Sequence, residues 1–293
     1  MKRKIYPDSL SISIVILFLS LPVFSQNLDT KKIDQALGRT GSRFDAVYKV
    51  TFPRSDLTVR LDGITIEPAL GLTTWIGFMP MGDEAMIMGD MVLLENEVYP
   101  VMKKMFSEGI SVSALHNHFL GTNPHVMFMH FSGMGNAAKL AASMKKVLGM
   151  TKTPLGKVTP PAAVKIDWSR VESVFGVKGS RSGHVLNIGV KRADVIKEGG
   201  MVIPPSMGTA MPFNFQMAGK KCAITGDFEL TADEVNPVIR ALIKNGIAAT
   251  AIHNHMLGEN PRLFYVHFWA VGDPGKLAVA LKEALGAMNS AVK

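Results

Sequence analysis

Cysteine is almost absent from this sequence, since Cys222 is the only thiol among 293 residues. A lone thiol cannot form an internal disulfide, so the fold has to be stabilised by its hydrophobic cores. Cys222 lies in the apolar stretch Cys222-Ala223-Ile224, which predicts a buried and unreactive side chain. No cysteine lies near the end of the N-terminal apolar segment, which excludes a lipid-modified N-terminus.

Several motifs that mark common enzyme classes are also missing. The sequence has no Gly-x-Ser-x-Gly, no glycine-rich phosphate loop followed by Lys-Ser or Lys-Thr, and no His-Glu-x-x-His. It has no basic stripe either, although the formal net charge is +8. The basic residues are scattered and are not interleaved with aromatic residues, so nucleic acid is not an expected partner. A weak preference for a small polar or anionic ligand is compatible with this charge.

The N-terminus has the pattern of an export signal. Lys2, Arg3 and Lys4 precede an apolar run from Leu10 to Leu21, and Val23-Phe24-Ser25 offers a cleavage site before Gln26. The run is shorter than the ~20 residues that a membrane-spanning helix needs. We therefore predict a signal peptide over residues 1–25 and a periplasmic or secreted protein with no transmembrane segment after cleavage. An uncleaved anchor is the alternative.

The rest of the chain contains an internal sequence repeat. A shift of 137 residues aligns Leu115-His116-Asn117-His118 with Ile252-His253-Asn254-His255 and His130-Phe131 with His267-Phe268. The shift also superposes the two Gly-x-Asn-Pro turns, so the chain carries a duplicated domain. We expect a first repeat at 26–150, a proline-containing linker at 151–161 and a second repeat at 162–293. Residues 44–148 and 181–285 should share one fold.

Hydrophobic periodicity within each copy predicts an α+β fold. In the first copy it predicts strands at 46–52, 73–78, 85–93, 110–120 and 126–133, and helices at 95–107 and 135–148. In the second copy, Thr231 and Glu234 form a capping box at a helix start. The order indicates two tandem repeats of a ferredoxin-like β-α-β-β-α unit with extra strands in mostly antiparallel sheets.

The repeated histidines are the strongest functional signal. His116 and His118 alternate to one face of their strand, and a five-residue turn would place His116 opposite His130. Three imidazoles with an open fourth position resemble the ligand set of a catalytic zinc site. The predicted ligands are His116, His118, His130, His253, His255 and His267. Asp90 and Asp227, on a neighbouring strand, are predicted to orient them from the second coordination shell.

Three interpretations of the histidines stay open at this point. The first is a divalent metal site with zinc as the leading candidate, the second is a metal-free ligand pocket, and the third is a structural cluster at the interface between repeats. Neither the number of sites nor the oligomeric state follows from the sequence. His125, which is replaced by Arg262 in the second copy, predicts only an exposed cation, and His184 has no evident partner.

The motif His-Asn-His-x-x-Gly-x-Asn-Pro-x-x-x-x-x-His, preceded by Glu-Val-x-Pro-Val and repeated, resembles the LppY/LpqO-type bacterial exported proteins. These proteins carry domain of unknown function 1259, in duplicate. The resemblance covers about residues 30–290 and implies export and a duplicated domain, but no activity. Two functions therefore remain as hypotheses: a non-catalytic binding or envelope-interaction protein, and a metal-dependent hydrolase-like enzyme with zinc-bound water as nucleophile. The catalytic residues are unknown, and whether the protein is an enzyme is uncertain.

Overall fold

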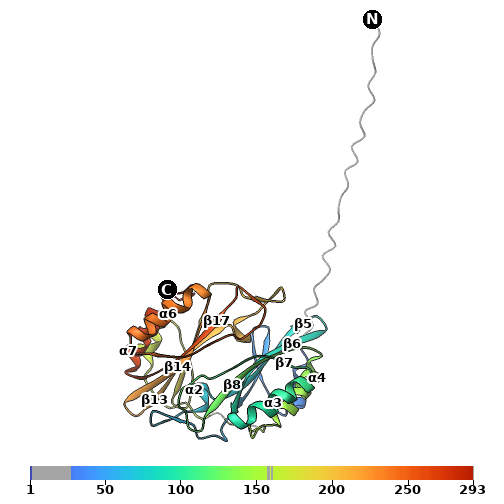
Figure 1. The fold of residues 1–293 in the computed structure, drawn as a ribbon, viewed down its shortest axis with the longest axis horizontal. Coiled ribbons are helices and arrows are strands. Elements are labelled where there is room, and N and C mark those ends of the chain that lie inside the picture. Colours follow the sequence, from blue (N-terminus) through green and yellow to red (C-terminus); the bar gives the residue numbers. More distant parts are fainter. Residues whose placement is uncertain (2–27, 157–158, 160, 293) are drawn as a thin grey trace.

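The computed structural model describes residue 1 and residues 28–156, 159 and 161–292. The predicted signal peptide lies outside these residues except for Met1. The chain forms two similar halves, each a six-stranded sheet with helices on its outer side (Figure 1). No helix among the described residues is long and apolar enough to cross a bilayer.

The first half contains four helices and eight strands. Its helices are α1 (Thr30–Leu37), α2 (Pro68–Gly71), α3 (Glu95–Ser107) and α4 (Ala137–Leu148). Its strands are β1 (Ser42–Phe44), β2 (Val47–Pro53), β3 (Arg60–Leu61), β4 (Ile64–Thr65), β5 (Thr73–Met81), β6 (Glu84–Leu94), β7 (Ser111–His116) and β8 (Val126–Gly135). The sheet order is β1-β2-β5-β6-β8-β7, and every neighbouring pair is antiparallel.

The second half repeats this plan. Its helices are α5 (Ser169–Phe175), the 3₁₀ turn η1 (Pro205–Met207), α6 (Ala232–Lys244) and α7 (Pro274–Leu285). Its strands are β9 (Ser180–Ser182), β10 (Val185–Lys191), β11 (Lys197–Glu198), β12 (Met201–Val202), β13 (Ala210–Ala218), β14 (Lys221–Leu230), β15 (Ala248–His253), β16 (Glu259–Asn260) and β17 (Phe264–Gly272). The sheet order β9-β10-β13-β14-β17-β15 corresponds strand for strand to that of the first half.

The predicted α+β class, the mostly antiparallel sheets and the two similar halves are confirmed. In the first half, β6 and β7 are parallel to each other because both are antiparallel to β8, which lies between them. The connection β6-α3-β7 is therefore a split β-α-β unit. The ferredoxin-like classification itself stays a prediction, and so do the repeat and linker boundaries.

Alternation along the strands assigns one sheet face to the helices and the other to the opposite repeat. On β6, Ile87, Met91 and Leu93 pack in the core under α3 and α4, whereas Met88 and Val92 point to the other side. On β14, Ile224 and Phe228 likewise join the core under α6 and α7. The inner faces of the two sheets therefore pack against each other.

Two apolar clusters seal this inner interface, and each is built from both repeats. The segment of the first repeat that precedes β5 packs against the second sheet, through Leu61, Ile66 and Leu70 on one side and Ala223 and Trp269 on the other. The corresponding segment of the second repeat packs against the first sheet, through Ile196, Ile203 and Met207 on one side and Val47, Met79 and Met88 on the other. The halves are therefore interlocked, and any side chain between the sheets is enclosed by both of them.

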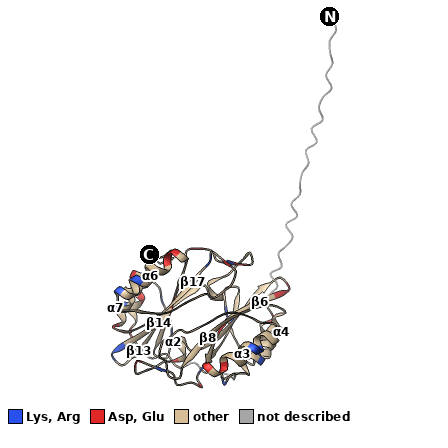
Figure 2. Ribbon diagram, in the orientation of Figure 1, with Lys and Arg blue, Asp and Glu red and all other residues tan. Residues whose placement is uncertain are grey.

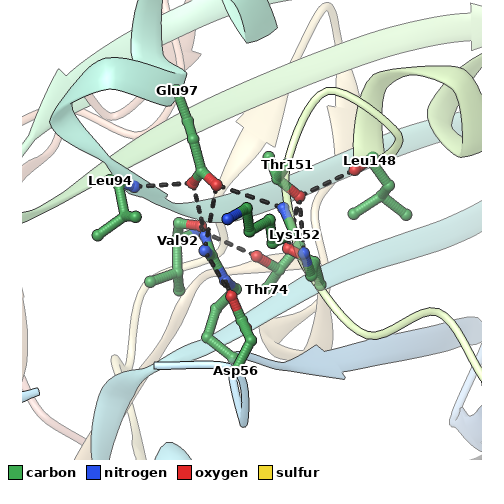
Figure 3. A network of polar contacts seen from close by, with 10 residues as sticks. Asp56, Thr74, Val92, Leu94, Glu97, Leu148, Thr151 and Lys152 are labelled. Carbon is green, nitrogen blue, oxygen red and sulfur yellow. Dashed lines mark hydrogen bonds and ion pairs between the residues drawn. The ribbon is translucent and has the colours of Figure 1, made fainter. Parts of the chain in front are cut away.

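A buried arginine fixes each inward segment to the helix that follows the central strand. The Arg54 guanidinium is fully buried and bonds to Glu97 of α3, to Asp56 and to the Val92 carbonyl. Glu97 also accepts the backbone N–H of Leu94, so it caps α3 as well as pairing with Arg54. Figure 3 shows Glu97, Asp56 and Val92 within this network.

The second repeat has the same arrangement around Arg192. Its guanidinium bonds to Glu234 of α6, to Asp194 and to the Glu229 carbonyl. Glu234 accepts the Thr231 N–H, which is one half of the predicted capping box. Among the outer helices, α3, α6 and α7 carry both basic and acidic residues, whereas the charged residues of α4 are all lysines (Figure 2).

Candidate metal centre

The two histidine motifs form one composite cluster between the sheets. His116 of the first repeat stacks on His253 of the second, with ring centroids 3.7 Å apart. Across the same interface, the centroids of His118 and His267 are 3.9 Å apart, as are those of His130 and His255. Contacts within one repeat, such as His116 to His130 at 4.9 Å, are longer than these. The histidines of each motif are therefore packed against the histidines of the other motif.

The register within each hairpin differs from the prediction. His116 pairs with Phe128, and His130 pairs with Ala114, because β7 ends at His116 and the loop to β8 is longer than the predicted five residues. His118 consequently lies in the loop rather than on a strand extending to Leu120. His116 and His130 still share a face because they occupy diagonal positions. The prediction of convergence holds for this pair, while the directly opposed pairing was wrong.

Backbone carbonyls fix the orientation of three imidazoles. Nδ1 of His130 lies 3.2 Å from the Gly89 carbonyl oxygen, and Nδ1 of His267 lies 2.9 Å from that of Gly226. A carbonyl oxygen can only accept, so Nδ1 carries the proton and Nε2 keeps its lone pair. Nε2 of both rings is buried and has no hydrogen-bond partner. Nδ1 of His255 makes the same contact, at 3.0 Å, with the Gly208 carbonyl oxygen.

The glycines that supply these carbonyls are required by the packing of the sheets. A Cβ on Gly89 would lie 2.2 Å from the Trp75 carbonyl oxygen, and a Cβ on Gly226 would lie 1.9 Å from that of Pro212. No side chain fits at either position. The repeated Gly-Asp step therefore keeps β6 and β14 close to their neighbouring strands, and it presents Asp90 and Asp227 toward the histidines.

The two carboxylates lie inside the cluster. Asp90 is directly opposite His130, and Asp227 is directly opposite His267. An Asp90 oxygen, Oδ2, is 3.4 Å from Nε2 of His118, whereas Oδ1 is buried without a partner. Asp227 repeats both features, with Oδ2 3.6 Å from Nε2 of His255. Both side chains therefore contact a histidine, which is where the sequence placed them.

Burial is the main electrostatic influence on this cluster. It lowers the pKa of His118 to about 3, and it lowers the pKa of the other five histidines below the ordinary value, helped in most of them by neighbouring imidazoles. Burial raises the pKa of Asp90 to about 6, against the opposing effect of His130. It raises the pKa of Asp227 to about 8, with a further contribution from Asp90. Neutral imidazole nitrogens and carboxylate oxygens are the ligands that a divalent cation such as zinc binds, and this cluster contains both.

The asparagine between the two histidines of each motif joins the repeats. Asn117 Nδ2 donates to the Thr250 carbonyl, and Asn254 Nδ2 donates to the Ser113 carbonyl. In return, the Thr250 hydroxyl donates to the His118 carbonyl and the Ser113 hydroxyl to the His255 carbonyl. Ser113 and Thr250 are the two bulged residues. We call these four hydrogen bonds the reciprocal clasp.

The inner faces also contain polar residues that the sequence analysis did not identify. Glu229 is fully buried opposite Tyr265, which donates to Oε1 of Glu229 at 3.2 Å and stacks on His255. Burial and Asp227 raise the pKa of Glu229 to about 9. The first repeat has Val92 and Phe128 at the corresponding positions. The sequence contained a signal for Glu229. It is two residues beyond Asp227 on the same strand, so the alternation of side chains along a strand places both on one sheet face.

The other two histidines lie outside the cluster. The His125 side chain is 47% exposed and lies 3.8 Å from Glu95, in agreement with the expectation of an exposed cation. His184 was expected to have no partner, but its Nδ1 is 2.7 Å from a Glu67 oxygen of the first repeat. Glu67 also lines a cavity of about 940 Å³, and none of the residues around that cavity belongs to the histidine cluster.

Three groups of side chains in the described part of the chain bring potential ligand atoms within 4.8 Å of one another. They are His116, His253 and His267; His130, His253 and His255; and Asp90, His116 and His130. Two of these groups draw on both repeats. The predicted trios of three histidines from one motif are not among the groups: His118 occurs in none of them, and His255 occurs only with His130 and His253.

Comparisons with known proteins add little about activity. Two solved structures have weak likeness to the chain. One is a trimeric bacterial microcompartment shell protein PduB, with 13% identity, 84% of this chain and 88% of that chain covered, and a TM-score of 0.21. The other is a double-ringed trimeric shell protein from the RMM microcompartment, with 9% identity, 73% and 86% covered, and a TM-score of 0.19.

No curated protein matches the chain. A family model, by contrast, matches it twice, over residues 31–150 and 169–287, and these ranges coincide with the two structural halves. Each match contains one histidine motif and its aspartate. The chain therefore belongs to the family described as Domain of Unknown Function (DUF1259) and contains that domain in duplicate.

Proposed function

We propose that this protein binds a divalent metal ion, zinc before others, in the composite cluster of six histidines and two aspartates. As part of the same proposal, it acts as an exported, LppY/LpqO-like protein in the periplasm or outside the cell. A metal-binding role needs nitrogen donors with free lone pairs, a compensating negative charge and shelter from water. The cluster offers all three at one place.

The observation that carries this proposal is the state of His130 and His267. Each donates its Nδ1 proton to a backbone carbonyl and leaves Nε2 buried without a partner. A histidine that binds a metal is normally held in this way, with its second ring nitrogen bonded to a carbonyl or carboxylate. A buried acceptor without any partner costs about 1–3 kcal/mol, and a bound cation removes that cost.

The unpartnered ring nitrogens also make a purely structural role of the histidine cluster a weaker interpretation. A histidine network that serves only packing should satisfy its own hydrogen bonds. Both ring nitrogens of His116 and of His253 are buried without partners. A small polar ligand that donates hydrogen bonds is the alternative occupant, because it would meet the same acceptors without a metal.

A hydrolase-like function is the second candidate, and Glu229 is the observation that favours it. A bound metal would supply an activated water, and catalysis also needs a group that moves a proton. Glu229 is a buried carboxyl that lies on the same strand face as Asp227 and is bonded to Tyr265. A panel of ester, phosphoester and amide substrates, assayed with and without zinc, tests this candidate.

Metal content and thermal stability test the primary proposal. We expect the purified protein to contain zinc or a related metal by mass spectrometry, and zinc to raise the Tm of the stripped protein. At a zinc concentration of 100 Kd, the stabilisation is about 2.7 kcal/mol. His253→Ala should reduce the shift clearly because His253 belongs to two of the three ligand groups. His184→Ala, which removes a histidine outside the cluster, should leave it unchanged.

The proposal fails if the stripped wild-type protein shows no shift with zinc, manganese or nickel and purifies without metal. If His253→Ala also unfolds the protein in that case, the structural interpretation is supported instead. Circular dichroism of each variant at 20 °C separates loss of binding from loss of fold.

A further inference from the structure

The unpartnered polar atoms of the cluster indicate how many ions it holds, given the metal-binding function proposed above. Eight of the eleven buried side-chain nitrogen and oxygen atoms that lack a partner among the described residues lie in the cluster. Four of them belong to each repeat. They are Oδ1 of Asp90, both ring nitrogens of His116 and Nε2 of His130, with the equivalent atoms of Asp227, His253 and His267.

One four-coordinate ion cannot satisfy this set. An ion takes one nitrogen from each imidazole and one or two oxygens from a carboxylate, so at most four of the six residues could contribute. At least two buried residues would then keep unsatisfied atoms in a water-poor interface, at a cost of about 1–3 kcal/mol each. Two ions with three protein ligands each use all six residues.

The internal repeat shows how the six residues divide. Asp90, His116 and His130 are all buried, and their ligand atoms lie within 4.8 Å of one another. The shift of 137 residues converts this trio into Asp227, His253 and His267. The histidine pairs of the two trios have the same spacing, with ring centroids 4.9 Å apart in the first and 4.8 Å apart in the second. The second trio as a whole is not among the groups whose ligand atoms lie within 4.8 Å of one another, so a bound ion there requires a small shift of its side chains. In each trio the aspartate is directly opposite the second histidine on the neighbouring strand.

We propose that the protein holds two divalent transition-metal ions, one in each of these trios. Each trio is a 2-His-1-carboxylate set, which leaves coordination positions open and suits first-row ions such as zinc, iron(II) or manganese. The aspartates are therefore ligands rather than second-shell groups. The two trios meet at the His116–His253 stack, whose ring centroids are 3.7 Å apart, so the two sites would share one enclosed space.

His118 and His255 act as positioning residues in this arrangement. Nε2 of His118 faces the second oxygen of Asp90, and Nε2 of His255 faces that of Asp227. His118 also contacts His267 of the opposite trio, and His255 contacts His130. Each of these two histidines thus links the carboxylate of one trio to an imidazole of the other.

Zinc stoichiometry in solution tests the assignment. The full chain from Gln26 is stripped with chelator and titrated with zinc by calorimetry, and metal content is measured after gel filtration. We expect two zinc ions per wild-type chain, one for His130→Ala, one for His267→Ala, and none for the double variant. His125→Ala removes an exposed histidine outside the cluster and should retain two. If an alanine variant does not fold, His→Asn at the same position replaces it.

Copper(II) loading tests whether the two bound ions lie close to each other, which stoichiometry alone does not show. The wild-type protein loaded with copper should show a half-field electron paramagnetic resonance signal, which arises only from two neighbouring copper ions. His267→Ala should show the spectrum of isolated copper.

A wild-type stoichiometry of one, lost in both single variants, overturns the two-ion assignment and leaves the proposed metal-binding function standing. Two ions that are both lost on a single substitution contradict the division into trios. No binding by the wild-type protein removes the proposed function itself.

Discussion

At the scale of single residues, the six clustered histidines make the stability of the metal-free protein depend on pH. Their pKa values are lowered by burial, so the folded chain keeps them neutral where the unfolded chain protonates them. Below pH ~6.5 the unfolded state binds more protons, and stability falls as pH falls. Each histidine contributes a slope of up to about 1.4 kcal/mol per pH unit.

Three buried carboxyls oppose this trend without reversing it. The raised pKa values of Asp90, Asp227 and Glu229 mean that the folded state holds their protons longer than the unfolded state does. We expect the free energy of unfolding in urea to drop by several kcal/mol between pH 7 and pH 5 in the stripped protein. Equal urea midpoints at the two pH values would contradict the neutral, buried state of the cluster.

At the scale of elements, the reciprocal clasp positions the two histidine loops. Asn117→Ala removes the donor to the carbonyls of Thr250 and Phe119. We expect a loss of about 1–3 kcal/mol in unfolding free energy. We also expect weaker zinc binding, because the loop that carries His118 loses its support against the second repeat. Urea denaturation and zinc titration measure the two effects.

Asn245→Ala is the matched control, since the Asn245 side chain donates to Ala241 and Glu283 of its own repeat and, among the described residues, has no hydrogen bond to the first repeat. It should alter stability slightly and zinc affinity not at all. An Asn117→Ala protein with wild-type affinity for zinc would show that the clasp does not position the site.

The elements themselves could largely be predicted from periodicity. The predicted helix at 95–107 coincides with α3, and the predicted strand at 126–133 lies within β8. The bulge at Ser113 could not be predicted, because it is stabilised by hydrogen bonds from Asn254 and to His255, 141 and 142 residues away. That bulge shifts the register of β7 against β8 between Val112 and Ala114. Local patterns carry no information about such distant partners.

At the scale of the whole molecule, the sequence indicated a duplicated domain but not how the copies face each other. Alternation predicts that His116 and His130 share a sheet face, but it does not say what covers that face. In the structure the covering surface is the other copy, which brings His253 and His255 into contact with the first motif. Glu229 and Tyr265 were missed because they occur in one copy only.

Export is a property of the whole chain, and protein chemistry can test it directly. The basic residues at 2–4, the short apolar run and Val23-Phe24-Ser25 predict cleavage after Ser25. N-terminal analysis of protein recovered from the periplasm or medium should begin at Gln26, with or without cyclisation to pyroglutamate. A mature protein that retains Lys2 to Lys4 would show that the segment is not removed. Ser25→Arg should block processing, and Ser9→Arg, farther from the cleavage site, serves as the comparison.

The reciprocal clasp has a consequence for the origin of this architecture. Asn117 bonds to Thr250 as Asn254 bonds to Ser113, so the same surface patch is used on both sides of the interface. Self-complementary contacts of this kind characterise the isologous interface of a two-fold homodimer. The present chain therefore has the form of such a dimer fused end to end. Within one chain the two halves can differ at equivalent positions, as they do at Glu229 and Tyr265, which correspond to Val92 and Phe128 in the first half. An ancestor with a single domain would have had to pair with its own copy to complete the cluster.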